Sequence, residues 1–354
     1  MISLRAYRSI SFLFLLHLLA LLGIACQSPK EQMPKEPSSE QSSTPAADNC
    51  RTVEHEKGET EICGQPQRVA TLSPHILDNL LALGVQPAAH ADSNVPSTPE
   101  FDQPEAQIPY LGRYITTQPV NLGLRDSPSI ERLVQLEPDL IVGESWLSEK
   151  QYQLLSQVAP TMLFNDRPGA IQHWRYSIEG VAKAVDKETE AKALLGQYSE
   201  KIAATREQLA PVVAAYPNVM VIDSDTALSA ISLSDDHTAT NLLREVGFEI
   251  VSSESSSLVS GSNPQVSIEI IPQIETDLVF VMAWGDDNML DPQKDTQQKW
   301  NDNPLLNQMS VAKEGRVFFV NYYLWGSHTR GPITERLILE QLPQMLLPLV
   351  DEAQ

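Results

Sequence analysis

Two stretches of the chain, 138 positions apart, have closely similar sequences. The first runs from Ser129 to Leu140 and the second from Ser267 to Leu278. Ser, Ile, Glu, Gln, Glu, Asp and Leu recur in register, and each stretch continues into an apolar, strand-like segment. A duplication of this kind predicts two related lobes with a cleft between them. Each lobe carries the same glutamate, Glu131 or Glu269, at the same local position.

The first 25 residues have the form of a secretory signal. A basic start with Arg5 and Arg8 precedes an apolar run that is short for a membrane span. The run ends in Leu22-Gly23-Ile24-Ala25-Cys26, which resembles a bacterial lipoprotein cleavage site, although a larger aliphatic residue is usual in place of Gly23. We therefore expect lipidation at Cys26; the alternative is an ordinary signal peptide with a chance cysteine. Residues 26–49 are mostly Ser, Pro, Glu and Gln, which predicts a disordered tether.

Two cysteines, Cys50 and Cys63, remain after export, and an exported chain can keep a disulfide. The segment between them contains Lys57-Gly58, a plausible hairpin turn. We expect a Cys50–Cys63 bridge that closes a hairpin. Two free thiols, or a metal pair with His55, are the alternatives.

The chain is strongly acidic once the leader is removed. The leader holds two of the 25 basic residues, so 23 remain against 46 acidic ones, a net charge of −23. Nucleic-acid binding requires basic patches, and adsorption to anionic lipid requires the same sign of charge. The charge therefore excludes both, and by itself it indicates only solubility.

Strand-like and helix-like segments alternate along the chain, which predicts α/β lobes. The first is a strand at 68–72 followed by a helix that Ser73 caps and Pro74 begins. We expect a first lobe at 50–166, a connecting helix at 167–188 and a second lobe at 189–354, with Pro211 and Pro217 bracketing a break. Further strands are expected at 161–164, 219–222, 278–282 and 317–320, and further helices near 149–158, near 239–246 and from Thr334.

Three motifs resemble the substrate-binding proteins of iron-siderophore and cobalamin ABC importers. They are Arg68-Val69 with Leu72-Ser73-Pro74, then Ser129-Ile130-Glu131 with Pro138-Asp139-Leu140, and finally Asn303-Pro304-Leu305 with Lys313-Glu314-Gly315-Arg316-Val317. The resemblance spans about residues 50–345. It implies two α/β lobes joined by one long backbone helix, with the ligand held between them and little hinge closure. Asp78 and Leu77 depart from the Glu and Thr that are common in the family.

The resemblance also implies roles for individual residues. One glutamate of each lobe meets arginines of the two permease subunits, and Glu131 and Glu269 match those positions. An acid in the first turn of a Ser-capped helix is also favoured by the helix dipole alone. In hydroxamate-siderophore binders an arginine at the position of Arg125 contacts the iron-bound oxygens; a surface pair with Asp126 or Glu131 is the alternative.

Aromatic and cationic residues that follow expected strands complete the predicted ligand site, because open α/β sheets bind ligands beyond their strand ends. For each of them, packing inside a lobe is the alternative. Arg113 and Tyr114 are weaker candidates of the same kind. With Arg125, the predicted ligand-binding residues are Trp146, Trp284, Tyr323, Trp325 and Arg330.

The remaining motifs favour binding over catalysis. His75, His237 and His328 are scattered, without the spacing of metal ligands, and we expect no metal site. The sequence contains no phosphate loop, zinc-protease helix or Gly-x-Ser-x-Gly elbow. We expect no enzymatic activity and no cofactor, with ferric iron present only as part of a bound chelate.

The prediction is therefore a monomeric, extracytoplasmic solute-binding lipoprotein, attached to the bacterial membrane by its lipid anchor alone. It would capture a ferric siderophore, of the hydroxamate or citrate-hydroxamate type, and deliver it to an ABC permease dimer for iron uptake. The first alternative keeps the architecture and changes the cargo to cobalamin or haem. The others are a secreted two-lobed α/β enzyme and an iron sensor or scaffold that binds without delivering.

Overall fold

The computed structural model describes residues 49–351 except 94, 166–172, 236, 252–264, 286–291 and 327–328. The described chain opens with an antiparallel hairpin of β1 (Cys50–His55) and β2 (Gly58–Cys63). Cys50 pairs with Cys63 across the hairpin, and the two sulfurs are bonded at 1.97 Å, which confirms the predicted disulfide. The turn is formed by Glu56 and Lys57, one residue earlier than expected, and Gly58 begins β2 with a φ of 114°.

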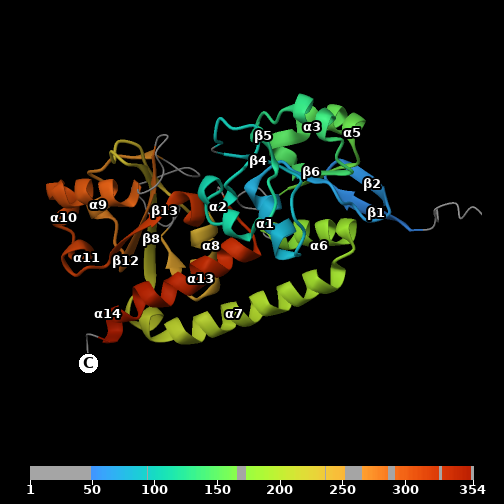
Figure 1. The fold of residues 1–354 in the computed structure, drawn as a ribbon. Coiled ribbons are helices and arrows are strands. Elements are labelled where there is room, and N and C mark those ends of the chain that lie inside the picture. Colours follow the sequence, from blue (N-terminus) through green and yellow to red (C-terminus); the bar gives the residue numbers. More distant parts are fainter. Residues whose placement is uncertain are drawn as a thin grey trace, which may run out of the picture. The chain divides into compact units, whose positions relative to one another are not determined.

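The first lobe is built on a five-stranded sheet in the order β5-β4-β3-β6-β7 (Figure 1). All its strand pairs are parallel, and its strands are short, apolar and largely buried, as expected of a sheet covered on both faces. The strands are β3 (Val69–Thr71), β4 (Ala89–Asp92), β5 (Val120–Leu124), β6 (Leu140–Glu144) and β7 (Thr161–Phe164).

The first helix of this lobe has the ends that its sequence predicts. The Ser73 hydroxyl accepts a hydrogen bond from the Ile76 N–H, Pro74 begins the helix, and Gly84 follows its end with a φ of 76°. The helices of the lobe are α1 (Pro74–Ala82), α2 (Pro104–Gln107), α3 (Ile130–Leu136), α4 (Ser145–Ser148) and α5 (Tyr152–Val158), with 3-10 helices η1 (Gly112–Tyr114) and η2 (Glu149–Gln151).

Two consecutive helices, α6 (His173–Val185) and α7 (Glu188–Ala215), lead from the first sheet to the second. The connecting helix was expected at 167–188, but α6 packs against α1 and β1 of the first lobe. Asp186, with a φ of 60°, separates α6 from the longer α7, which packs against α6 and against α13 near the end of the chain. Pro211 lies within α7 and does not end it, since a missing N–H removes only one hydrogen bond near the end of the helix.

The second lobe is built on a six-stranded sheet in the order β11-β9-β8-β12-β13, with β10 also paired to β8. Its central strands are parallel, whereas β9 is antiparallel to β8. The strands are β8 (Asn218–Asp225), β9 (Ile231–Leu233), β10 (Glu249–Ile250), β11 (Gln265–Val266), β12 (Leu278–Trp284) and β13 (Val317–Asn321). The helices are α8 (Thr238–Glu245), η3 (Ile271–Gln273), α9 (Pro292–Asp302), α10 (Pro304–Asn307), α11 (Ser310–Lys313), α12 (Tyr322–Trp325), α13 (Pro332–Leu346) and α14 (Pro348–Asp351).

The duplicated sequence occupies equivalent places in the two sheets. The Asp139 carboxylate accepts hydrogen bonds from the backbone N–H groups of Gln67 and Arg68, at 2.8 and 2.9 Å. The Asp277 carboxylate likewise accepts from the N–H of Asn218 at 2.9 Å. The next residue pairs with the first central strand in each lobe, Leu140 with Val69 and Leu278 with Val219. Two related α/β lobes, the predicted fold class, are therefore confirmed.

The two copies of the repeat differ in one respect. The first forms α3, whose N-terminus Ser129 caps by accepting from the Arg132 N–H. The second forms a turn followed by η3, and Pro272 lies within that 3-10 helix. A proline has no N–H for the helical ladder, so a full α-helix is less favourable there.

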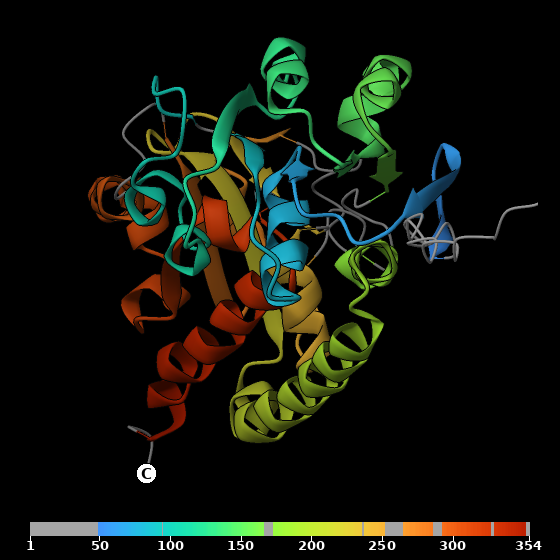
Figure 2. The same ribbon diagram turned by 45° about the vertical axis from the view of Figure 1, so that its right-hand side comes forward.

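The lobes meet where α1 approaches the N-terminus of α13 (Figure 2). The buried Asp78 carboxylate accepts from the N–H groups of Ile333 and Thr334, at 2.9 and 3.0 Å, and from the Thr334 hydroxyl at 2.6 Å. A Cβ at Gly331 would lie 2.3 Å from the Asp78 carboxyl carbon, so only glycine allows this approach. We call the contacts of Asp78 with residues 331–334 the lobe seam. Among the described residues, none of the helices has the length and hydrophobicity that crossing a membrane requires.

Candidate ligand-binding site

The carboxyl ends of β3 and β6 lie side by side at the point where the strand order of the first sheet reverses. Connections from the two strands leave in opposite directions, and such a switch point is where open α/β sheets bind ligands. His75 follows β3 at the start of α1, and Glu144 is the last residue of β6.

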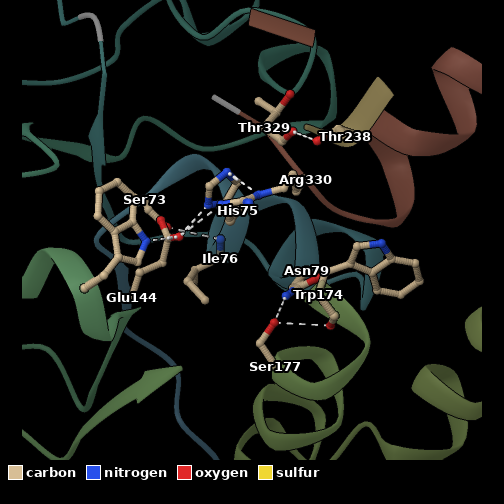
Figure 3. Close-up of polar contacts among 11 residues, drawn as sticks. Ser73, His75, Ile76, Asn79, Glu144, Trp174, Ser177, Thr238, Thr329 and Arg330 are labelled. Atoms are coloured by element: carbon tan, nitrogen blue, oxygen red, sulfur yellow. Dashed lines mark hydrogen bonds and ion pairs between the residues drawn. The ribbon is translucent and has the colours of Figure 1, made fainter. Parts of the chain in front are cut away.

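Glu144, His75 and Arg330 form a buried polar chain that joins the two lobes (Figure 3). His75 Nδ1 lies 2.6 Å from Glu144 Oε1, and Arg330 Nε donates to His75 Nε2 at 3.3 Å. Arg330 Nη2 is 3.8 Å from the same Glu144 oxygen. Each of the three side chains is almost completely buried, at 1% exposure or less.

The geometry defines the charges in this chain. Since His75 Nε2 accepts from Arg330, the imidazole is neutral and donates from Nδ1 to Glu144. Burial lowers the pKa of His75 to about 4, Glu144 opposes this effect, and Arg330 adds to it. Burial alone would raise the pKa of Glu144, but His75, Arg330 and Arg125 outweigh it and lower that pKa to about 2. At neutral pH the chain therefore consists of a carboxylate, a neutral imidazole and a guanidinium.

Trp146 and Arg125 extend this chain toward solvent. The Trp146 indole donates to Glu144 Oε1 at 2.9 Å and remains 37% exposed. The Arg125 guanidinium lies over its ring, 5.5 Å from the centroid, in a cation–π contact. Arg125 Nη1 has no hydrogen-bond partner among the described residues, and the surface pairs with Asp126 or Glu131 are not formed. This arginine is therefore anchored to an aromatic ring with donors to spare.

A second buried acid, Asp92, ends the neighbouring strand β4 and also contacts the other lobe. It accepts from the Tyr323 hydroxyl at 2.6 Å and lies 3.1 Å from His90 Nε2. Burial would raise the pKa of Asp92, but His90, Tyr323 and the Ser93 N–H together lower it. Tyr323 also stacks on Tyr110 of the first lobe.

The corresponding place in the second lobe lies between the carboxyl ends of β8 and β12. Asp223 Oδ2 is 3.8 Å from His237 Nε2, and Trp284 forms a hydrogen bond with Asp223. Burial raises the pKa of Asp223 to about 6, which Trp284 opposes. Burial, with Arg330 adding to it, lowers the pKa of His237 to about 4. This end of the second sheet is therefore polar but nearly uncharged.

Comparison with known proteins places this arrangement in a family. The model of a periplasmic binding protein family matches residues 69–323. The chain belongs to the periplasmic binding protein family. A Bacillus subtilis protein named as a probable siderophore-binding lipoprotein is 24% identical over 90% of this chain and 92% of its own length. The Fe(3+)-citrate-binding protein of the same organism is 24% identical over 78% and 79% of the two chains. The crystal structure of Staphylococcus aureus SirA complexed with staphyloferrin B superposes with a TM-score of 0.67 and 25% identity, covering 84% of this chain and 98% of that one.

The match confirms the resemblance that the sequence motifs indicated, and the family is one of solute-binding proteins rather than enzymes. In this periplasmic binding protein the predicted ligand residues occupy three environments. Arg125 and Trp146 lie together at the end of the first sheet, and Trp284 lies partly buried at the end of β12 in the second. Arg113 is exposed and stacks on Tyr114, away from these strand ends.

The other three predicted residues are buried by packing. Tyr323 and Arg330 are 3% and 1% exposed and bond to side chains of the opposite lobe. Trp325, 1% exposed, stacks on Phe280 in the core and donates to Gln341. They follow the expected strand, but helix α12 turns Tyr323 and Trp325 inward, so a ligand could reach them only after rearrangement.

Sequence reasoning missed the buried acids of the site, Glu144, Asp92 and Asp223. A signal for them exists, since each interrupts or ends an apolar strand where an ionisable side chain is costly to bury. His75 and His237 have hydrogen-bonding partners, as expected of satisfied histidines. His328 and Cys26 lie outside the described residues.

Metal-ligand geometry among the described residues is confined to Cys50, Glu61 and Cys63. The two sulfurs of this group are joined in the disulfide, so they are not free thiolates. The predicted docking acids are exposed. Glu131 accepts weakly from Gln135, and the pKa of Glu269 is lowered by hydrogen bonds from its own backbone N–H and from Ser267.

Proposed function

We propose that this protein captures a ferric siderophore outside the cytoplasm and delivers it to an ABC permease. The observation that carries the proposal is the Arg125–Trp146 pair at the carboxyl ends of β5 and β6. It presents an unpaired guanidinium donor beside an exposed aromatic face in a family of solute-binding proteins. The names of the relatives, which include siderophore and ferric-citrate binders, support the same cargo class.

The side chains at this end of the first lobe favour an anionic chelate. Two guanidinium groups, Arg125 and Arg330, face one carboxylate, Glu144, so the local charge is positive although the whole protein is acidic. Arg125 can donate to several acceptor oxygens of the chelate, and Trp146 offers its apolar ring. Trp284 contributes from the second lobe. Tyr323 and Arg330 act behind this surface by holding the lobes together, and Trp325 serves the core.

Intrinsic tryptophan fluorescence with a panel of ferric hydroxamate, citrate and catecholate siderophores, cobalamin and haem tests this function. We expect saturable quenching by at least one ferric siderophore. Arg125→Gln should weaken that binding by about tenfold or more, the loss typical of a hydrogen bond to a charged group. Arg244→Gln, at an exposed arginine bonded only to Asn241, is the matched control. If none of the ferric siderophores quenches, or if cobalamin or haem alone does, the proposed cargo is wrong.

Delivery to the permease would use Glu131 and Glu269, one exposed carboxylate from each lobe. Paired with permease arginines, such carboxylates form directional, charge-assisted hydrogen bonds. The double variant Glu131→Ala/Glu269→Ala should bind cargo normally and lose uptake in whole cells. Glu105→Ala/Glu207→Ala, at exposed sites on other helices, should retain both. Normal uptake by the first variant would refute the docking role.

Attachment through Cys26 completes the proposal. Cys26→Ser should release the protein from the membrane fraction while leaving cargo affinity unchanged. Membrane association of this variant equal to that of the wild type would contradict the lipid anchor.

A further inference from the structure

A cavity of about 240 Å³ lies among three helices, α1, α7 and α13, and η1. Figures 1 and 2 show α13 beside both α1 and α7. None of its lining residues belongs to the strand-end site described above. We call this cavity the helix pocket, and it is lined by Leu81, Ala82, Tyr114, Leu194, Gln197, Tyr198, Lys201, Pro332, Ile333 and Arg336.

The interior of the helix pocket is apolar. Leu81 and Ile333, 8% and 6% exposed, face it from α1 and α13, and Leu194 faces it from α7. Ala82 and Pro332 complete this surface. The cavity exceeds the roughly 150 Å³ in which a protein interior holds benzene, so it can accommodate a larger hydrocarbon body.

Cations stand at the polar side of the same pocket. Lys201 is half-buried and has neither a hydrogen bond nor an ion pair among the described residues. Arg336 donates to the Tyr114 hydroxyl at 3.3 Å, and its only described carboxylate is Glu340, at 3.9 Å. A partly desolvated ammonium without a carboxylate partner is costly beside apolar surface. An anionic group bound there would remove that cost.

We propose that the helix pocket binds a small carboxylate with an apolar body. The hydrocarbon part lies against Leu81, Leu194 and Ile333, and the carboxylate lies between Lys201 and Arg336. This site is separate from the strand-end site, and the proposal does not depend on the identity of the cargo.

Occupancy of the helix pocket acts on the lobe seam. Leu81 lies one helical turn from Asp78 on α1, and the N–H of Ile333 is bonded to the Asp78 carboxylate. A ligand that touches Leu81 and Ile333 therefore adds contacts between the same two helices that the seam joins. Since such a ligand binds the folded protein, it also raises the thermal midpoint by mass action.

Isothermal titration with decanoate below its micellar concentration tests the proposal. We expect saturable binding of one decanoate per protein, and no comparable binding of the neutral decanamide. Lys201→Gln should weaken decanoate binding by about tenfold or more. Lys192→Gln, at an exposed lysine on the same helix outside the pocket, should leave it unchanged.

A second variant tests the location independently of charge. Ala82→Phe fills the cavity and should abolish decanoate binding, while a ferric siderophore that binds the wild type should bind this variant equally well. Absence of saturable decanoate binding to the wild type overturns the proposal, as does equal binding to Lys201→Gln and Lys192→Gln. Equal binding of decanamide and decanoate overturns the assignment of a carboxylate. Siderophore binding is read separately, so failure here is distinguishable from failure of the proposed function.

Discussion

The two sheets are alike where their central strands begin and different where they end. At the beginning, Asp139 and Asp277 bond the backbone in the same way. At the end, Glu144 of the first lobe is ionised among guanidinium groups, with a pKa near 2, whereas Asp223 of the second has its pKa raised to about 6 by burial. The shared end organises the lobe, and the divergent end provides different chemistry for binding.

The difference predicts opposite pH dependence for the two acids. Below its ordinary value of 4.5, the pKa of Glu144 makes the folded state bind fewer protons than the unfolded state between pH 2 and 4.5. Its contribution to stability is thus complete above 4.5 and lost as the pH falls toward 2. Asp223, raised from 3.8, binds more protons in the folded state between pH 4 and 6, so its contribution weakens as the pH rises through that range.

The largest expected effect is that of Glu144→Gln. The change leaves the Arg330 charge buried without its carboxylate, so the free energy of unfolding at pH 7 should fall by about 3 kcal/mol, measured by urea denaturation. Glu245→Gln breaks a more exposed ion pair with Arg175 and should cost about 1 kcal/mol or less. Equal losses in the two variants would show that the buried chain has no special importance.

Asp223→Asn should act in the opposite direction. An amide at this position removes the cost of ionising a buried acid at pH 7 and can still accept from Trp284. We expect the free energy of unfolding to rise by about 2 kcal/mol, given about 1.4 kcal/mol for each unit of pKa shift. A loss of stability on this substitution would mean that the Asp223 charge has a partner in the folded protein.

Difference profiles of stability against pH sharpen the comparison, because titrations common to all variants cancel. Wild type minus Glu144→Gln should rise between pH 2 and 4.5 and then level off, whereas wild type minus Asp223→Asn should fall between pH 4 and 6. Thermal midpoints across this range provide the measurement. Two profiles of the same sign would remove the distinction between the lobes.

The smallest expected effect separates the two copies of the repeat. Ser129→Ala removes a helix cap and should cost about 1 kcal/mol in urea denaturation. Ser267→Ala precedes only a turn and η3, and should cost less than half as much. Equal costs would mean that the structural difference at Pro272 has no energetic consequence.

Much of this architecture was predictable from local sequence. The repeat predicted two lobes, and Ser73-Pro74, Thr161–Phe164 and the core of β12 were predictable because caps and apolar runs report local structure. The break between α6 and α7 was placed less well, because Asp186 at positive φ gives a weaker signal than a proline or glycine.

The site was less predictable because it depends on contacts between distant segments. Arg125 and Trp146 were named separately, but their stacking required β5 and β6 to end at the same edge. Arg330 and Tyr323 were expected to face a ligand, and instead they bond to acids of the other lobe, more than 180 residues away in the sequence. Local patterns carry no record of which lobe will cover a side chain.

The missing side chain of Gly331 sets the distance between two helices on which both lobes depend. Adding one methyl group there would bring a carbon within 2.3 Å of the Asp78 carboxyl carbon, far inside a normal contact. The whole N-terminus of α13 would have to retreat, carrying Arg330 away from His75. A single position thus controls the spacing of the lobes without touching cargo, and it offers a simple way to adjust the width of a binding site while leaving every ligand contact intact.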